Sequence, residues 1–166
     1  MKLNKNEKFV LMLMIKNPLI TNKEIAKKLK ITSQGAGKIR KQLYKKGIIK
    51  NHELGLDYEK LGVNILAIAM IKILPSVFKK FKKNELDEVL RHMNVIRSYA
   101  IPETDITHMI LYAFRNIKEY DIYFRNILEK FGDYVEIKHT FVISSGSKIK
   151  SSSKDIFLDV LNKLET

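Results

Sequence analysis

The sequence predicts an α+β protein in which a small helical domain precedes a domain built on a β-sheet. Three observations predict this division. Apolar residues recur at helical spacing through the first 50 residues, strand-like and helix-like segments alternate after Gly62, and positive charge is concentrated near the start. A chain of 166 residues has room for two such domains, each with a modest core.

The formal net charge of +13 is divided unevenly along the chain. Residues 1–60 carry 15 Lys and Arg against 5 Asp and Glu, a net +10, whereas residues 61–166 carry 16 against 13, a net +3. A compact basic region binds polyanions because it releases the counterions that condense on them. The charge therefore favours a nucleic acid as partner, with an anionic membrane second.

Several kinds of chemistry are not expected. The chain has no cysteine, which excludes disulfides and thiolate metal sites, and its four histidines are far apart. We therefore expect no metal and no cofactor. Phosphate-loop and nucleophile motifs are missing, so no catalytic residue is assigned. Apolar runs stay below the roughly 18 residues of a membrane span, and the start does not read as a signal peptide, so we expect no membrane and a cytoplasmic protein.

Two helices are predicted before residue 31. The first follows Asn6, is apolar over most of its circumference and ends where Pro18 forbids continuation. The second begins at Thr21, which has the capping-box spacing to Glu24. An apolar stripe follows this cap: Ile25, Ala26 and Leu29.

A third helix is predicted between Thr32 or Ser33 as N-cap and Gly47 as C-cap. Its apolar positions fall on one side, and an amide with three amines falls on the other: Gln34, Lys38, Lys41 and Lys45. Such a face suits the major groove of DNA, where Gln bridges adenine edges and Lys reaches guanine or phosphate. A simple solvated lysine face has the same pattern, so the pattern alone leaves both interpretations open.

The expected DNA-binding residues lie in and beside this third helix: Thr32, Ser33, Gln34, Gly35, Gly37, Lys38, Arg40, Lys41 and Lys45. Inside a helix each glycine costs about 1 kcal/mol relative to alanine, so the two glycines need a reason. They permit either a close approach to the sugar-phosphate wall or packing under the first helix. Arg40, at the edge of the packed face, is expected to reach a phosphate.

After Gly62 the pattern is strand, helix, strand, strand, helix, strand, which is the order of a ferredoxin-like βαββαβ sandwich. The expected strands are residues 63–74, 95–103, 107–116 and 135–145. The helix between the first two strands is expected to turn Met93 inward with Leu86, Val89 and Leu90. The last strand is expected to place Val135, Ile137 and Phe141 on one face.

A serine-rich stretch and a short amphipathic helix follow the last strand. Such a helix is too short to be stable alone, so it is expected to dock on its own domain or on a neighbour. The predicted boundaries are residues 1–56 for the helical domain, 57–64 for a hinge, 65–146 for the sheet domain and 147–166 for the C-terminal linker and helix.

Over roughly residues 5–145 these motifs resemble the Lrp/AsnC family of transcription regulators, whose DNA-binding domain is a winged helix-turn-helix. One group of residues resembles the end of the family's recognition helix and the strand after it: Leu43, Lys45, Lys46, Gly47, Ile48 and Ile49. A short wing over residues 51–56 follows. A second group resembles the hinge motif: Asp57, Lys60, Leu61 and Gly62.

The resemblance implies a sequence-specific, DNA-binding transcription regulator that is not an enzyme, works as a dimer or a multiple of dimers, and binds double-stranded DNA. It also implies a possible amino acid or other small-molecule effector at the loop of Glu103, Thr104 and Asp105, which has the aspartate of the family's effector motif but not its glycine. Two alternatives stay open: an enzyme resembling the sirohaem decarboxylases, which share the two-domain plan, and a nonspecific chromosome-packing protein.

Overall fold

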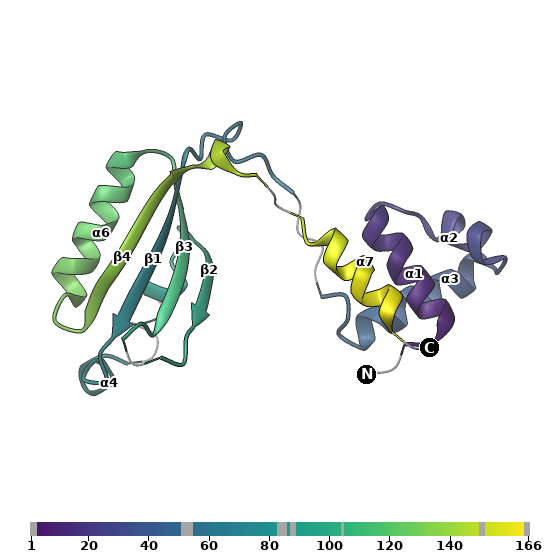
Figure 1. The fold of residues 1–166 in the computed structure, drawn as a ribbon, viewed down its shortest axis with the longest axis horizontal. Coiled ribbons are helices and arrows are strands. Elements are labelled where there is room, and N and C mark those ends of the chain that lie inside the picture. The colour runs from purple at the N-terminus through teal and green to yellow at the C-terminus, as the bar shows by residue number, and fades with distance from the viewer. Residues whose placement is uncertain are drawn as a thin grey trace. The chain divides into compact units, whose positions relative to one another are not determined.

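The computed structural model describes residues 3–50, 55–82, 86, 89–103, 105–149 and 152–164. The chain divides into two compact units, Met1–Leu54 with Lys150–Thr166, and Gly55–Ile149. Helices make up the described part of the first unit, and the second contains a four-stranded antiparallel sheet (Figure 1). The α+β fold predicted from the sequence is confirmed.

The first unit begins with α1 (Lys5–Lys16), α2 (Asn22–Leu29) and α3 (Ser33–Lys45). Helix α1 starts two residues earlier than expected because Asn4 and Glu7 form a capping box. The Glu7 amide donates to Asn4 Oδ1 at 2.8 Å, and the Asn4 amide donates to Glu7 Oε2 at 3.0 Å.

The next two helices begin where the sequence predicted. Thr21 and Glu24 form the expected capping box, with the Thr21 amide donating to Glu24 Oε2 at 2.7 Å. The Thr32 hydroxyl accepts from the Gly35 amide at 3.0 Å and caps α3. Gly47 follows this helix at φ +69°, in the left-handed region that glycine adopts without strain.

The first unit also contains α7 (Lys154–Lys163), which packs on α1. Leu161 of α7 is 5% exposed and joins the core of the three N-terminal helices. The ammonium of Lys8 donates to the Leu164 carbonyl at 2.6 Å, next to this contact. The C-terminal helix therefore docks on the helical unit.

The second unit is a sheet with strand order β2-β3-β1-β4, as in the ferredoxin-like arrangement. The strands are β1 (Ile65–Ile73), β2 (Val95–Ala100), β3 (His108–Phe114) and β4 (Val135–Ser144), and the helices are α4 (Val77–Lys80) and α6 (Ile117–Phe131), with a 3₁₀ turn at Ser145–Ser147. Helix α6 lies along one face of the sheet (Figure 1). An aromatic core fills the space between them, with Tyr112, Phe114, Phe124 and Phe131 all buried.

Two expectations about the sheet unit were wrong. Met93 was expected to point inward but is 91% exposed in the turn before β2. Phe141 does not share a face with Ile137, because a β-bulge between Met70 and Ile71 shifts the register of β4 at Lys138. One extra residue in a strand turns all later side chains to the opposite face.

A single helical turn begins the second unit and explains the hinge motif. Asp57 Oδ1 accepts from the Lys60 amide at 3.2 Å, and the Val63 amide donates to the Tyr58 carbonyl at 2.8 Å. Gly62 closes the turn at φ +78°, which only glycine adopts freely. Asp57 thus caps the start of this turn, and Gly62 ends it.

Some sequence expectations lie outside the described residues. These include residues 51–54 of the expected wing, and Glu85, Asp87 and Glu88 of the helix expected over residues 85–93. In that last segment Leu86 and Val89 are buried, as predicted. None of the helices in the described part of the chain combines the length and apolarity needed to cross a membrane.

Candidate nucleic-acid interface

Helix α3 has one buried side and one exposed side. Ala36 and Leu43 are fully buried against α1 and α2. The exposed side carries the amide and amines that the sequence predicted: Gln34, Lys38, Lys41 and Lys45. Because caps hold both ends of the helix, this polar side is presented on a rigid element.

A shallow depression of about 440 Å³ runs between this side of α3 and the start of α2. Its lining is entirely polar or glycine: Asn22, Ser33, Gln34, Gly37, Lys38 and Lys41. Five of these six residues were expected at the interface. Asn22 was missed, although it directly follows the Thr21 cap at the start of α2 and therefore lies next to the predicted turn before α3.

The two glycines of α3 face α2 and the preceding turn. A Cβ atom on Gly37 would lie 3.2 Å from Asn22 Nδ2, and one on Gly35 would lie 3.2 Å from Thr32 Oγ1. Packing under the first helix, one of the two reasons considered from the sequence, does not account for them. Only Gly37 lines the depression, where the missing side chain keeps space open.

Arg40 is engaged inside the unit. Its guanidinium donates from Nη1 to Asn22 Oδ1 at 3.1 Å and from Nη2 to the Ile20 carbonyl at 2.9 Å. The side chain is half-buried, and it fixes the Asn22 amide at the edge of the depression. Arg40 therefore acts on the interface through Asn22 in this structure.

An ion pair with a buried carboxylate joins the first turn of α1 to the residue that caps the C-terminal end of α3. Glu7 of α1 is 1% exposed, and its carboxylate accepts from Lys46 Nζ at 2.6 and 2.7 Å. The Lys46 ammonium and the Asn4 amide together hold the pKa of the Glu7 carboxyl below its ordinary value. The pair anchors the C-terminal end of α3, and sequence reasoning missed it.

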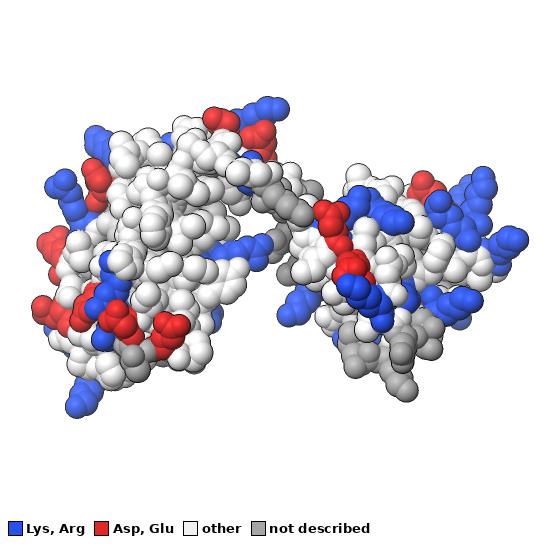
Figure 2. Space-filling model, viewed as in Figure 1, with Lys and Arg blue, Asp and Glu red and all other residues white. Residues whose placement is uncertain are grey.

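Charge is distributed differently on the two units. In the view of Figure 2, blue side chains project from the first unit, and red appears chiefly beside α7, whereas red and blue are mixed on the sheet unit. This matches the uneven net charge of the two halves of the sequence. A cationic surface around a helix that exposes an amide and amines is typical of a DNA-binding domain.

The residues expected at an effector site lie in the loop between β2 and β3. Asp105 is exposed, and its carboxylate lies 3.0 Å from Lys138 Nζ and 3.7 Å from Lys72 Nζ. The hydrogen bond from Lys138 holds the pKa of the Asp105 carboxyl below its ordinary value. Glu103 is exposed beside it, and Thr104 lies outside the described residues.

Comparison with known proteins agrees with this geometry. Residues 3–50 match a family model described as a winged helix-turn-helix DNA-binding domain. The HTH-type transcriptional regulator LrpA of Pyrococcus horikoshii is 28% identical over 109 residues, which cover 66% of this chain and 72% of that protein. The chain is thus similar to transcription regulators of the Lrp/AsnC family, and its residues 3–50 match a DNA-binding domain.

Solved structures of similar fold span both units of this chain. AsnC of E. coli has a TM-score of 0.71 at 17% identity and covers 93% of this chain and 99% of its own. A transcriptional regulator from Neisseria meningitidis, solved in complex with L-Met, also has a TM-score of 0.71 at 17% identity, covering 92% of this chain and 96% of its own. At these identities the likeness supports the two-unit fold.

Proposed function

We propose that α3 reads a specific DNA sequence, with Gln34 and Lys38 in contact with base edges and the surrounding residues in contact with the backbone: Thr32, Ser33, Gly35, Gly37, Lys41 and Lys45. The observation that carries this proposal is the polar depression beside the exposed side of α3. An amide and an amine one helical turn apart can address neighbouring base pairs in the major groove. Arg40 is assigned a positioning role through Asn22.

The test compares the cognate site with random DNA. An operator is first selected from a random oligonucleotide pool. Gln34→Ala and Lys38→Ala should each weaken operator binding by about 1 to 3 kcal/mol, because each removes base contacts, and should weaken binding to random DNA far less. Lys118→Ala, an exposed lysine on α6, is the matched control. Equal losses on both DNAs would contradict base reading.

We also propose that two copies associate through the open face of the sheet. Tyr99, Phe141 and Ile143 are 48%, 53% and 41% exposed. Phe141 pairs with Ile68 across the strands, and cross-strand partners share a face. Ile143 and Tyr99 pair with Leu66 and Met109 on the same face. An apolar face of this kind, opposite α6, is typical of a protein interface.

Light scattering tests this association. Phe141→Asp should convert the oligomer into monomers, because it buries an unpaired charge in the proposed interface. Loss of the second DNA-binding unit should then lower operator affinity at least tenfold. Ile117→Asp, a 53% exposed residue at the start of α6, is the control. An unchanged mass for Phe141→Asp would disprove this interface.

The L-Met complex of the Neisseria relative supports a small-molecule effector for this chain as well. We place it at Glu103 and Asp105, where carboxylates could bind the ammonium group of an amino acid in competition with Lys138. Each of the twenty amino acids is added separately, and the midpoint of thermal unfolding is measured. At least one should raise the midpoint, and Asp105→Asn should remove the shift while Asp133→Asn keeps it. No shift with any amino acid would exclude this class of effector.

A further inference from the structure

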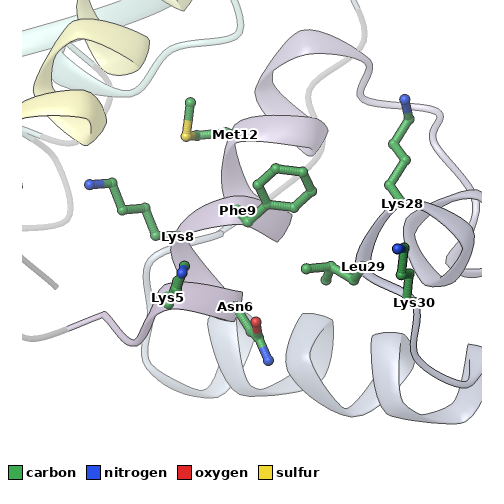
Figure 3. Close-up of a pocket in the computed structure, with 8 residues that line it drawn as sticks. All are labelled: Lys5, Asn6, Lys8, Phe9, Met12, Lys28, Leu29 and Lys30. Carbon is green, nitrogen blue, oxygen red and sulfur yellow. The ribbon is translucent and has the colours of Figure 1, made fainter.

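A pocket of about 470 Å³ lies between α1 and the end of α2, and its lining shares no residue with the depression beside α3. Its floor is apolar. The Phe9 ring and the Leu29 side chain face each other across the gap between the two helices (Figure 3), and Met12 also lines the pocket. Phe9 is 40% exposed although it is a large apolar residue.

The rim of this pocket is cationic. Four of the eight residues that line the pocket are lysines and none is acidic: Lys5, Lys8, Lys28 and Lys30. Lys8 already holds the Leu164 carbonyl. Lys5, Lys28 and Lys30 are exposed, and within the described part of the chain none of them lies within 4.0 Å of a carboxylate oxygen, although Lys28 interacts at longer range with Glu24 of the same helix. The pocket thus combines uncovered apolar surface with an excess of positive charge.

Lys30 supplies a second observation. It follows α2 at φ +55° and is the one non-glycine residue of the described chain with positive φ. A side chain in this left-handed region costs about 1 kcal/mol or more, and glycine occupies most such positions after helices. Strained residues of this kind concentrate at functional sites. Here the strain places an ammonium at the rim of the pocket.

From these features we propose that the pocket binds an acidic segment of a partner protein, which inserts an aromatic or aliphatic side chain between flanking carboxylates. The apolar anchor would cover Phe9 and Leu29, and the carboxylates would pair with the lysines of the rim. Apolar anchors in a pocket give affinity, and charge complementarity at the rim gives specificity and fast association.

Other occupants fit the pocket less well. DNA phosphates would gain nothing from the apolar floor and would lose hydration against it. A small molecule usually has most of its surface enclosed by its site, whereas this pocket is open on one side and its polar groups are flexible lysine ends and Asn6. A protein segment can cover the open side with its own surface.

The probe is a fluorescent 12-residue peptide with one central Phe between Asp and Glu residues. Two control peptides replace the acids by Asn and Gln, or the Phe by Ala. Fluorescence anisotropy with the full chain should give at least tenfold tighter binding for the probe than for either control. Phe9→Ser should abolish the difference between Phe and Ala peptides, and Lys28→Gln should weaken the probe at least threefold. Lys23→Gln, an exposed lysine of α2 outside the pocket, should leave it unchanged.

Lys30→Gly separates this role from stability. The variant should raise the midpoint of thermal unfolding, because glycine relieves the left-handed strain. It should nevertheless weaken binding of the probe peptide at least threefold, while the affinity for operator DNA changes less than twofold.

Three binding results would overturn the proposal: equal binding of all three peptides, loss of probe binding in Lys38→Ala, or displacement of the probe by operator DNA. A change in oligomeric state for Asp155→Asn with Asp159→Asn would instead indicate α7 of a second copy as the occupant, and would also overturn it.

Discussion

The two units of this protein are stabilised in different ways. The sheet unit has a continuous aromatic core, in which Tyr112, Phe114 and Phe124 contact one another at centroid distances of 5.4 to 6.3 Å. The helical unit has a smaller core of aliphatic residues and one buried carboxylate. It also carries most of the net positive charge. The unit that we propose binds DNA is therefore the one with less apolar burial and more self-repulsion.

The helical unit compensates through features that the sheet unit lacks in the described part of the chain. A helix from the far end of the sequence contributes Leu161 to its core, and Glu7 is buried in contact with Lys46. Both features stabilise the position of α1, which packs against α3. The comparison indicates that the charged face of α3 depends on contacts that stabilise the opposite side of the helical unit.

The largest expected effect tests the contribution of α7. Leu161→Ala should destabilise the helical unit by about 2 to 5 kcal/mol, the range for removing a buried leucine. Hydrogen exchange should then quicken in α1 and α3 and stay unchanged in β1 and β3. Ile156→Ala, 63% exposed on the same helix, is the control. An equal increase of hydrogen exchange in both units would contradict the prediction that α7 stabilises the helical unit alone.

The next effect tests the buried ion pair. Glu7→Gln should lower the free energy of unfolding by about 1.5 to 3 kcal/mol, because it removes charged hydrogen bonds to Lys46. Lys46 is 39% exposed and can turn to solvent, which keeps the loss below that of a fully buried pair. Chemical denaturation monitored through α-helical circular dichroism measures the loss. Glu59→Gln, an exposed carboxylate, should have no effect.

The same pair predicts a pH dependence. The pKa of Glu7 is lower in the folded chain than its ordinary value of about 4.3, so the folded state binds fewer protons than the unfolded state near that pH. Its contribution is complete above the unfolded pKa and disappears as the pH falls through the folded pKa. The stability difference between the native chain and Glu7→Gln should therefore shrink below about pH 4. A constant difference would mean that the charge of Glu7 is unimportant.

Local signals predicted most of the fold. The caps at Thr21 and Thr32, the stop at Gly47 and the strand and helix order follow from residues close in sequence. The exposed side of α3 follows from helical periodicity alone. Phe141 could not be placed, because the bulge that turns it outward arises from pairing between β1 and β4, which are far apart in the chain.

The features that the sequence did not predict depend on long-range contacts. Asn22 is held by Arg40, 18 residues away, and Glu7 pairs with Lys46, 39 residues away. No periodicity within one helix shows that such residues meet. Leu161 illustrates the same limit, since its amphipathic helix predicts docking without indicating the surface on which it docks.

The smallest expected effect on stability concerns Gly37, on the exposed side of α3. Gly37→Ala adds about 1 kcal/mol of helix propensity, and its methyl group would lie 3.2 Å from Asn22 Nδ2, which must move by a few tenths of an ångström. Because Arg40 holds the Asn22 amide, the two effects should nearly cancel, and the free energy of unfolding should change by less than about 1 kcal/mol. Operator affinity should nevertheless fall, since the methyl group occupies the depression proposed to face DNA. An operator affinity that is unchanged in Gly37→Ala would mean that DNA does not enter this depression, even if α3 still faces the duplex.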